Sequence, residues 1–305
     1  MFQLSRILVP WPSVSDAALA QALHLATRCQ AALHLVRVDT SDGDAAPWNV
    51  AQRLETVRAE ARRLGFAPAD AGRPLQVARV VAPSRAEGLL AYAKTAAAGL
   101  IVAAPASSAL TDPDTAALVR QAQCPVLTVA NDRQQPPARI LAPIDFSLHA
   151  QTALAHAKTL AHYYGATLHA LHVVEVPHYV ALNATDMLAL SDAKLPERKA
   201  RRRLEAFVQD TGGPSVPVRS HVMHGDAAEH ISTFAEHHHA DLVTLASHGV
   251  LARRAQPLGN VARKTLRRLS TATLLLRAFG TSLMPEGPPH SANRPPPSGP
   301  SAPEA

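Results

Sequence analysis

The sequence predicts an α/β fold of two tandem domains, each with a five-stranded parallel sheet covered by helices on both faces. One observation is a repeat of roughly 140 residues, which is the size of a whole domain rather than of a solenoid unit. A second is that short, nearly continuous apolar runs alternate with amphipathic stretches in each copy, as parallel sheets require. The third is the length of 305 residues, which by itself favours two domains.

The repeat can be followed segment by segment. The run RILVP at 6–10 returns as RILAP at 139–143. The other matching pairs are 31–35 with 166–170, 99–102 with 240–243, and 125–129 with 272–276. We therefore expect one domain at 1–132, a linker at 133–138 and a second domain at 139–280.

The apolar runs give the strands and the amphipathic stretches give the helices. In the first copy we expect helices between strands at 6–10, 32–38, 75–81, 99–104 and 125–130. In the second copy the expected strands are 139–143, 167–174, 217–223, 241–246 and 272–277, with helices at 148–163, 196–211, 227–238 and 259–269. The crossovers between parallel strands should be right-handed.

Some boundaries have a local cause. Ser147 can cap the helix that starts at 148, because its hydroxyl can accept from a free N–H of the first turn. Gly212-Gly213-Pro214 should end the preceding helix before the third strand. The segment 281–305 holds eight prolines and few groups that could bury a core, so we expect a disordered tail.

Composition excludes several classes. No apolar run approaches the roughly 18 residues that cross a bilayer, and the N-terminus shows no signal-peptide pattern, so we expect a cytoplasmic protein without membrane contact. The net charge is +6, yet aromatic residues make up only 4%, which leaves little stacking surface for nucleic acid. We interpret the basic runs at 198–203 and 253–268 as solvated helix faces. Cys29 and Cys124 form no CxxC pair and are expected to be core thiols.

One loop of the second copy has the character of a phosphate site. Ser247-His248-Gly249 follows the fourth expected strand, and Gly259-Asn260-Val261 comes after nine further residues and opens a helix. Glycine lets the backbone approach a ligand closely, and a helix N-terminus offers unpaired N–H groups and a positive dipole end. Arg253 and Arg254 within the loop could add charge to a triphosphate. Open parallel sheets bind ligands at the carboxyl ends of their strands, where Asp145 also lies.

On these residues the chain resembles the universal stress protein family in its tandem form, over about 5–280. The family's phosphate pattern is Gly-x-x-Gly, nine residues, then Gly followed by Ser, Thr or Asn. Here Gly249, Gly259 and Asn260 keep the spacing, while Ala246 replaces the first glycine. Further similar segments are 143–147 (PIDFS), His172-Val173, His224-Gly225-Asp226 with Ile231, and 240–243.

The resemblance implies Rossmann-like domains of the adenine nucleotide α-hydrolase type, with ATP, and Mg²⁺ beside it, bound in the second domain. Asp145 would contact the nucleoside and Val173 would back the adenine. The full set of implied binding residues is Pro143, Ile144, Asp145, Val173, Gly225, Ala246, Ser247, His248, Gly249, Gly259, Asn260 and Val261. It also implies that the final strands of the two domains, 125–130 and 272–277, pair antiparallel across a pseudo-twofold axis.

The first copy departs from the pattern at each ligand position. Trp11-Pro12-Ser13 stands where an acid is expected, and Pro105-Ala106-Ser107-Ser108 replaces the Ser-His-Gly loop. We expect this copy to bind no nucleotide and to act as the partner subunit of an intramolecular pseudo-dimer. In the second copy, Ala246 is harmless if its φ is negative and strained if its φ is positive. Retained binding is the preferred interpretation, and a vestigial loop is the alternative.

Thirteen of the sixteen histidines lie between His149 and His248. We expect surface and helix-capping roles for them, with His237-His238-His239 near the final carbonyls of a helix and the backbone rather than the ring of His248 at the loop. A metal site is the alternative. Neither a GxSxG elbow nor a Walker A loop is present, which indicates no dedicated enzyme and at most weak ATP hydrolysis.

The expected function is therefore stress-response sensing or scaffolding with an adenine nucleotide and a protein partner of unknown identity. Alternatives are a nucleotide-free interaction scaffold, a histidine-based metal binder and, last, an adenylyl-transfer enzyme. Whether two chains associate further is left open by the sequence.

Overall fold

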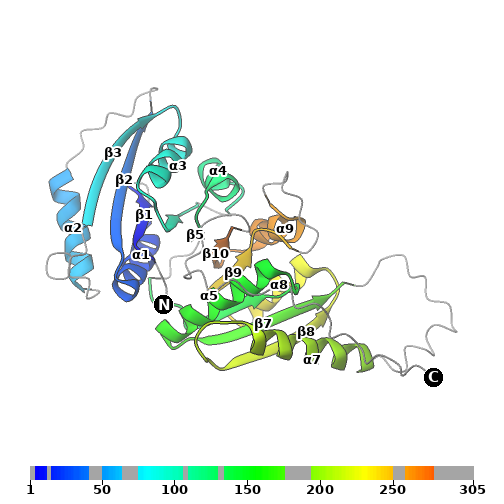
Figure 1. Cartoon of the computed structure of the whole chain (residues 1–305). Helices are drawn as coiled ribbons and strands as arrows, with labels where there is room; N and C mark the ends of the chain where they lie inside the picture. Colours follow the sequence, from blue (N-terminus) through cyan, green and yellow to red (C-terminus); the bar gives the residue numbers. More distant parts are fainter. Residues whose placement is uncertain are drawn as a thin grey trace, which may run out of the picture.

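A computed structural model describes residues 4–11, 15–40, 50–63, 75–105, 109–129, 134–175, 194–249 and 258–277. Strands and helices alternate along these ranges (Figure 1). The strands are β1 (Arg6–Pro10), β2 (Ala32–Thr40), β3 (Leu75–Ala82), β4 (Leu100–Ala103), β5 (Val126–Thr128), β6 (Arg139–Pro143), β7 (Thr167–Val174), β8 (Val218–His224), β9 (Leu242–Ala246) and β10 (Ala272–Leu276). The helices are α1 (Asp16–Cys29), α2 (Val50–Arg63), α3 (Arg85–Thr95), α4 (Pro113–Gln121), α5 (Leu148–Tyr164), α7 (Lys194–Asp210), α8 (Ala227–His237) and α9 (Asn260–Arg268).

The strands form one sheet in the order β3-β2-β1-β4-β5-β10-β9-β6-β7-β8. Within each half every pairing is parallel, as predicted. The halves meet where β5 and β10 pair antiparallel, with Leu127 opposite Leu274. The antiparallel pairing expected from the resemblance is thus confirmed, and it merges the two five-stranded sheets into a single ten-stranded sheet.

Helices cover both faces because successive residues of a strand point to opposite sides. Ile140 and Ala142 of β6 belong to a core with residues of α1, α2, α5 and α7, whereas Leu141 between them packs with residues of α8. In the N-terminal half the second face is closed by α3 and α4. The first of these cores runs across the junction of the two halves and includes Leu127 and Leu274.

The helices predicted at 148–163 and 196–211 are observed as α5 (Leu148–Tyr164) and α7 (Lys194–Asp210), within two residues at each end. The Ser147 hydroxyl accepts from the Ala150 N–H at 3.0 Å, so it caps α5 as expected. At the other end Gly165 adopts φ 65°, a left-handed conformation that ends the helix at little steric cost. Helix α7 ends at Asp210, directly before the Gly-Gly-Pro segment.

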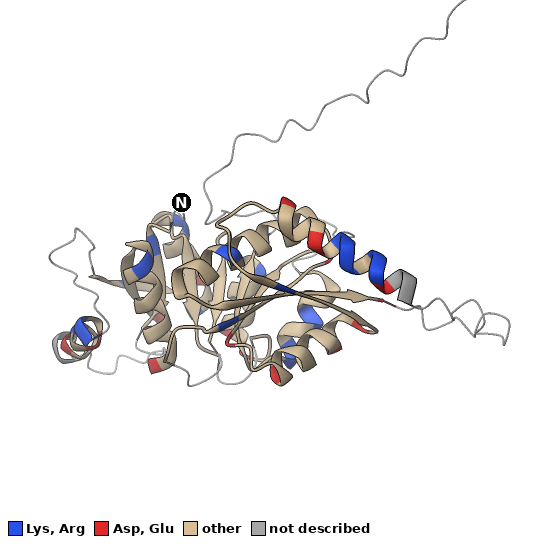
Figure 2. Cartoon of the chain, turned by 90° about the horizontal axis from the view of Figure 1, so that it is seen from below, with Lys and Arg blue, Asp and Glu red and all other residues tan. Residues whose placement is uncertain are grey.

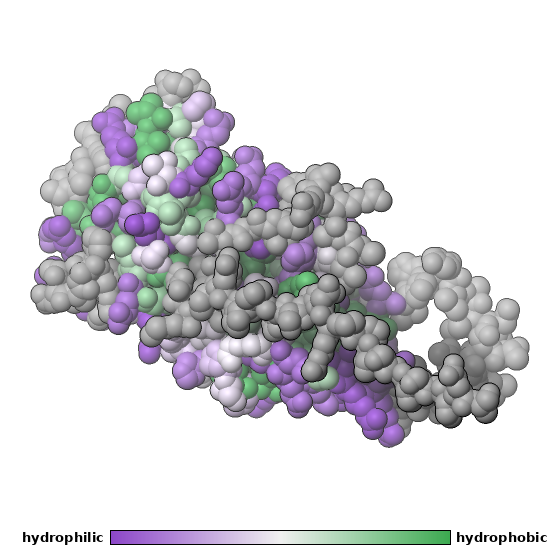
Figure 3. Space-filling view, viewed as in Figure 1, coloured by the Kyte–Doolittle hydropathy of each residue, from purple (hydrophilic) through white to green (hydrophobic). Residues whose placement is uncertain are grey.

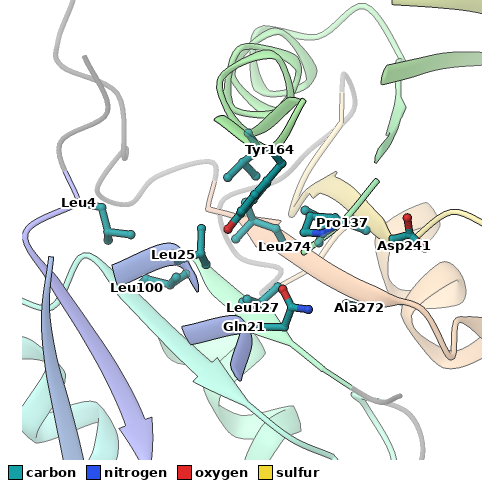
Figure 4. Close-up of a pocket in the computed structure, with 12 residues that line it drawn as sticks. Leu4, Gln21, Leu25, Leu100, Leu127, Pro137, Tyr164, Asp241, Ala272 and Leu274 are labelled. Atoms are coloured by element: carbon teal, nitrogen blue, oxygen red, sulfur yellow. The ribbon is translucent and has the colours of Figure 1, made fainter. Parts of the chain in front are cut away.

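A small cavity lies between the halves, above the β5–β10 pairing and between α1 and α5 (Figure 4). It encloses about 20 Å³ and is lined mainly by leucine, alanine and proline side chains. Tyr164, the last residue of α5, contributes its hydroxyl, which is buried and has no hydrogen-bond partner. Gln21 and Asp241 also line it, but the Gln21 amide donates to the Gln135 carbonyl and Asp241 accepts from two backbone N–H groups.

Several expectations can be placed only in part. The following lie outside the described residues: Pro12, Ser13, the segment 106–108, Arg253, Arg254 and the tail at 281–305.

Cys29 and Cys124 are both free thiols, half-buried and buried respectively. Burial raises the pKa of Cys29 to about 12 and that of Cys124 to about 11, so both are thiols at neutral pH. Of the described helices, none is long and apolar enough to span a bilayer.

Candidate functional site

Two predicted ligand positions meet at the carboxyl edge of the sheet. Asp145 follows β6 and Gly249 follows β9, and these strands are neighbours. The Asp145 carboxylate accepts from the Ser147 backbone N–H at 3.0 Å and from its hydroxyl at 2.6 Å, which fixes the turn into α5. A methyl group at position 249 would overlap the second carboxylate oxygen of Asp145. Glycine allows this close approach, whereas any other residue would require the Asp145 carboxylate to shift.

The loop after β9 returns to the same place before α9. The Gly259 N–H donates to the Ser247 carbonyl at 2.8 Å, and the Ser247 N–H donates to the Leu276 carbonyl at 2.8 Å. Gly259 is the N-cap of α9 and supplies no side-chain cap, and the first turn carries no acid. Within the described residues no side chain caps the first N–H groups of α9, and the positive end of this helix lies beside the edge that holds Asp145 and Gly249.

In the N-terminal half, the N-terminus of the equivalent helix, α4, is capped by its own residues. Asp112 is the N-cap of α4 and its carboxylate accepts from the Thr115 N–H at 2.7 Å. Pro113 at the first position brings no N–H at all. A negative charge already occupies this helix end, so an anion is repelled there. This gives a physical reason, beyond the missing glycines, for the expectation that the first copy binds no nucleotide.

Ala246 stands at the end of β9 in register with Leu276. The described non-glycine residues with positive φ are Gln30, Ala97, Phe146 and His239, and Ala246 is not among them. Its methyl group packs against the core on the α5 side. The condition under which this substitution costs little is therefore met, and the backbone at this position carries no strain.

The remaining predicted residues surround this edge in different ways. Val173 on β7 is 9% exposed and shares a core cluster with Val261 of α9 on one face of the sheet. Ile144 is buried on the opposite face, and its N–H donates to the Leu171 carbonyl. Pro143 is the last residue of β6, and the exposed Asn260 accepts from Arg263 through its side-chain oxygen.

Gly225 follows β8 at the same edge with φ 137°, a conformation that other residues rarely adopt. Its N–H donates to the Val174 carbonyl at 3.0 Å. The next residue, Asp226, caps α8 and pairs with Lys264 at 3.1 Å and with Arg268 at 3.6 Å. The Glu229 N–H and these cations hold the pKa of Asp226 below its usual range. This contact ties α8 to α9 beside the loop.

Phe146, in the turn between β6 and α5, adopts φ 63°, which is rare for a bulky residue. Its ring lies 4.4 Å from His172 and 5.5 Å from Phe207, and the Arg203 guanidinium lies 4.0 Å from its centroid. Basic residues gather on α7 around Arg203 (Figure 2), and this part of the surface is hydrophilic (Figure 3). No sequence signal separates Phe146 from an ordinary core aromatic.

The expectation that the histidines lie at the surface or at helix ends is wrong for several of them. The His248 ring is 3% exposed, and its Nδ1 lies 2.9 Å from the Ser247 hydroxyl, so the ring as well as the backbone shapes the loop. His156 is fully buried in α5, and His169 is 6% exposed. His238 does not lie over the final carbonyls with its ring but packs on Phe234 at 3.9 Å.

A metal centre finds no support in the described ranges. They contain no group of three histidine, cysteine, aspartate or glutamate residues arranged to hold an ion.

The model of the universal stress protein family matches the chain twice, at 4–130 and at 137–277. The chain belongs to the universal stress protein family. A universal stress protein of Methanocaldococcus jannaschii is 26% identical over 141 residues, which is 46% of this chain and 81% of the relative.

Solved structures show the same fold over most of the chain. A functionally unknown protein from Pseudomonas aeruginosa aligns with a TM-score of 0.69 at 22% identity, covering 90% of this chain and 93% of its own. A universal stress protein from Archaeoglobus fulgidus aligns with a TM-score of 0.53 at 15% identity, covering 90% and 97%. These likenesses establish the tandem Rossmann-like architecture.

Proposed function

We propose that the C-terminal domain of this universal stress protein binds an adenine nucleotide, with ATP as the preferred candidate and Mg²⁺ on its phosphates. The N-terminal domain would serve as a non-binding partner. The bound nucleotide would report a stress state to a protein partner, and the protein would act in the cytoplasm. It would turn ATP over slowly at most, since Asp145 is the only carboxylate that the described residues place beside Gly249 and nothing marks it as a general base.

The observation that carries the proposal is the meeting of Asp145, Gly249 and the N-terminus of α9 at one edge. The polar end would take phosphates through backbone N–H groups and the helix dipole. Val173 and Val261, which share one apolar cluster, would offer a surface for the base. The unstrained backbone at Ala246 supports retained rather than vestigial binding.

The test is calorimetric titration of the full chain with ATP, ADP and AMP in the presence of Mg²⁺. A Gly259→Asp variant would give α9 the same acidic N-cap that Asp112 gives α4. A Cβ atom at 259 meets its nearest neighbours at 3.4–3.7 Å, so the variant should fold. We expect it to weaken nucleotide binding at least roughly tenfold through repulsion of the phosphates.

Gly259→Ala is the matched control, because it adds the methyl group without the charge. It should bind within about threefold of the wild type, since the helix dipole is unchanged. Equal binding by Gly259→Asp and the wild type would place the phosphates elsewhere. Absence of binding by the wild type at millimolar nucleotide would refute the proposal and leave the nucleotide-free interaction scaffold.

A further inference from the structure

Three histidines from three elements converge on the face of the sheet that α8 covers, away from the edge that holds Asp145 and Gly249. They are His169 near the start of β7, His221 of β8, and His238 directly after α8. His169 Nδ1 and His221 Nε2 lie 3.1 Å apart, and the two rings are nearly parallel with centroids 5.2 Å apart. The His238 centroid lies 5.6 Å from His169 and 5.7 Å from His221.

Phe234 of α8 closes this histidine cluster. Its ring stacks on His238 at 3.9 Å and lies 4.8 Å from His221 and 5.8 Å from His169. The contacts of these four rings therefore join the C-terminal end of α8 to β7 and β8. Since β8 is the last strand of the sheet, it has a neighbouring strand on only one side.

The charges around the cluster disfavour added protons. Arg219 of β8 acts on both paired rings, Arg139 of β6 acts on His169, and Arg201 of α7 acts on His221. Two of these arginines also lie beside carboxylates: Asp241 lies 4.0 Å from Arg139, and Glu197 lies 3.8 Å from Arg201. Burial, reinforced by the neighbouring imidazoles and arginines, lowers the pKa of His169 and lowers that of His221 to about 4.

The hydrogen bond between His169 and His221 needs one nitrogen without a proton. A first added proton places a charge among three arginines, and a second removes the acceptor so that two donors face each other. We propose that the histidine cluster is an acid-sensitive contact, which holds α8 against β7 and β8 at neutral pH and releases it when the imidazoles are protonated.

Release of α8 would affect the proposed nucleotide site, because α8 also contacts α9. The N-cap of α8 is Asp226, which pairs with Lys264 and Arg268 of α9. Loosening α8 would remove support from the helix whose N-terminus is the proposed phosphate site. This consequence rests on the proposed function, whereas the acid-driven release does not.

The test is hydrogen exchange of the full chain without nucleotide at pH 7.5 and pH 5.0, read by mass spectrometry and corrected for intrinsic exchange rates. Peptides from α8 and β8 report the contact, and peptides from α4 serve as the reference. A pKa of about 4 for His221 in the closed state against 6.5 in the open state gives roughly a 30-fold loss of protection at pH 5.0. Because solvent screens the partly exposed His221 ring, we expect about a tenfold loss of protection.

His169→Gln and His221→Gln each remove one ring of the hydrogen-bonded pair, and each should reduce the acid response of α8 and β8 to less than about threefold. His224→Gln is the matched control, since His224 lies exposed on the same strand and outside the cluster. It should respond as the wild type does. A wild type without an acid response, or a full response that persists in both cluster variants, would overturn the proposal.

Discussion

Replacing Tyr164 by phenylalanine is predicted to stabilise the protein, although it removes the tyrosine hydroxyl group. The Tyr164 hydroxyl is buried without a hydrogen-bond partner, and burial raises the pKa of Tyr164. The neighbouring cavity has room for about one water molecule, but a buried water needs two or more polar partners. The Gln21 amide nitrogen and the Asp241 Oδ2 atom are already bonded to backbone groups, and the remaining lining is mainly apolar, so we expect the cavity to be dry.

The magnitude follows from the cost of an unsatisfied buried donor, which is about 1–3 kcal/mol. Phenylalanine leaves the ring packing in place and removes that cost. We therefore expect the free energy of unfolding of Tyr164→Phe to rise by up to about 1–3 kcal/mol. At about 2–4 °C per kcal/mol for a domain of 150–250 residues, the midpoint should rise by several degrees.

Tyr92→Phe is the matched control for the same chemical change. The Tyr92 hydroxyl lies 2.9 Å from Nδ1 of the buried His34, so its loss leaves that ring nitrogen unpaired and should cost about 1–3 kcal/mol. Both variants would be measured by urea unfolding and by calorimetry. The reasoning fails if Tyr164→Phe is destabilised as much as Tyr92→Phe, because the Tyr164 hydroxyl must then have a partner such as a bound water.

Three further predictions follow from single contacts. Gly249→Ala should lower the free energy of unfolding by about 1–3 kcal/mol and weaken nucleotide binding, because its methyl group displaces the Asp145 carboxylate. Gly212→Ala is the control, since nothing lies within 4 Å of the added methyl group, and it should change the midpoint of urea unfolding little. Lys158→Met should cost about 1–3 kcal/mol in urea unfolding, since the Lys158 ammonium donates to the Val208 and Thr211 carbonyls at 2.7 Å each. Burial lowers the pKa of His156 to about 4, so on acidification the unfolded state takes up a proton before the folded state does. The free energy of unfolding should therefore fall by about 3 kcal/mol as the pH falls from 6.5 toward 4. In His156→Gln, unfolding measured over this pH range should no longer show that pH dependence.

Strand placement was predictable because the signal is local. Near-continuous apolar runs give strands in an α/β fold, and β1, β6 and β7 have the predicted bounds. Caps such as Ser147 are equally local, since one side chain and one N–H group decide them. The single continuous sheet came from the family resemblance, because nothing in the composition of β5 or β10 specifies an antiparallel partner about 145 residues away.

The candidate site was predictable as a set of positions but not as a set of contacts. The meeting of Asp145 with Gly249 depends on the order of β6 and β9 in the sheet, which spacing alone does not give. The histidine cluster was missed for a related reason. Each strand taken alone does not place His169 beside His221, because their convergence arises only from the register between β7 and β8 and from the end of α8.

The antiparallel pairing of β5 with β10 makes the two-domain assembly independent of protein concentration. A dimer of separate chains dissociates on dilution, whereas domains joined by a short linker face each other at an effective concentration of about millimolar. The pairing also means that each half covers one open edge of the other, which leaves β3 and β8 as the outer strands. Because the two halves of the chain have different sequences, one can change its ligand edge, as Asp112 at α4 illustrates, while the shared strand pairing is kept.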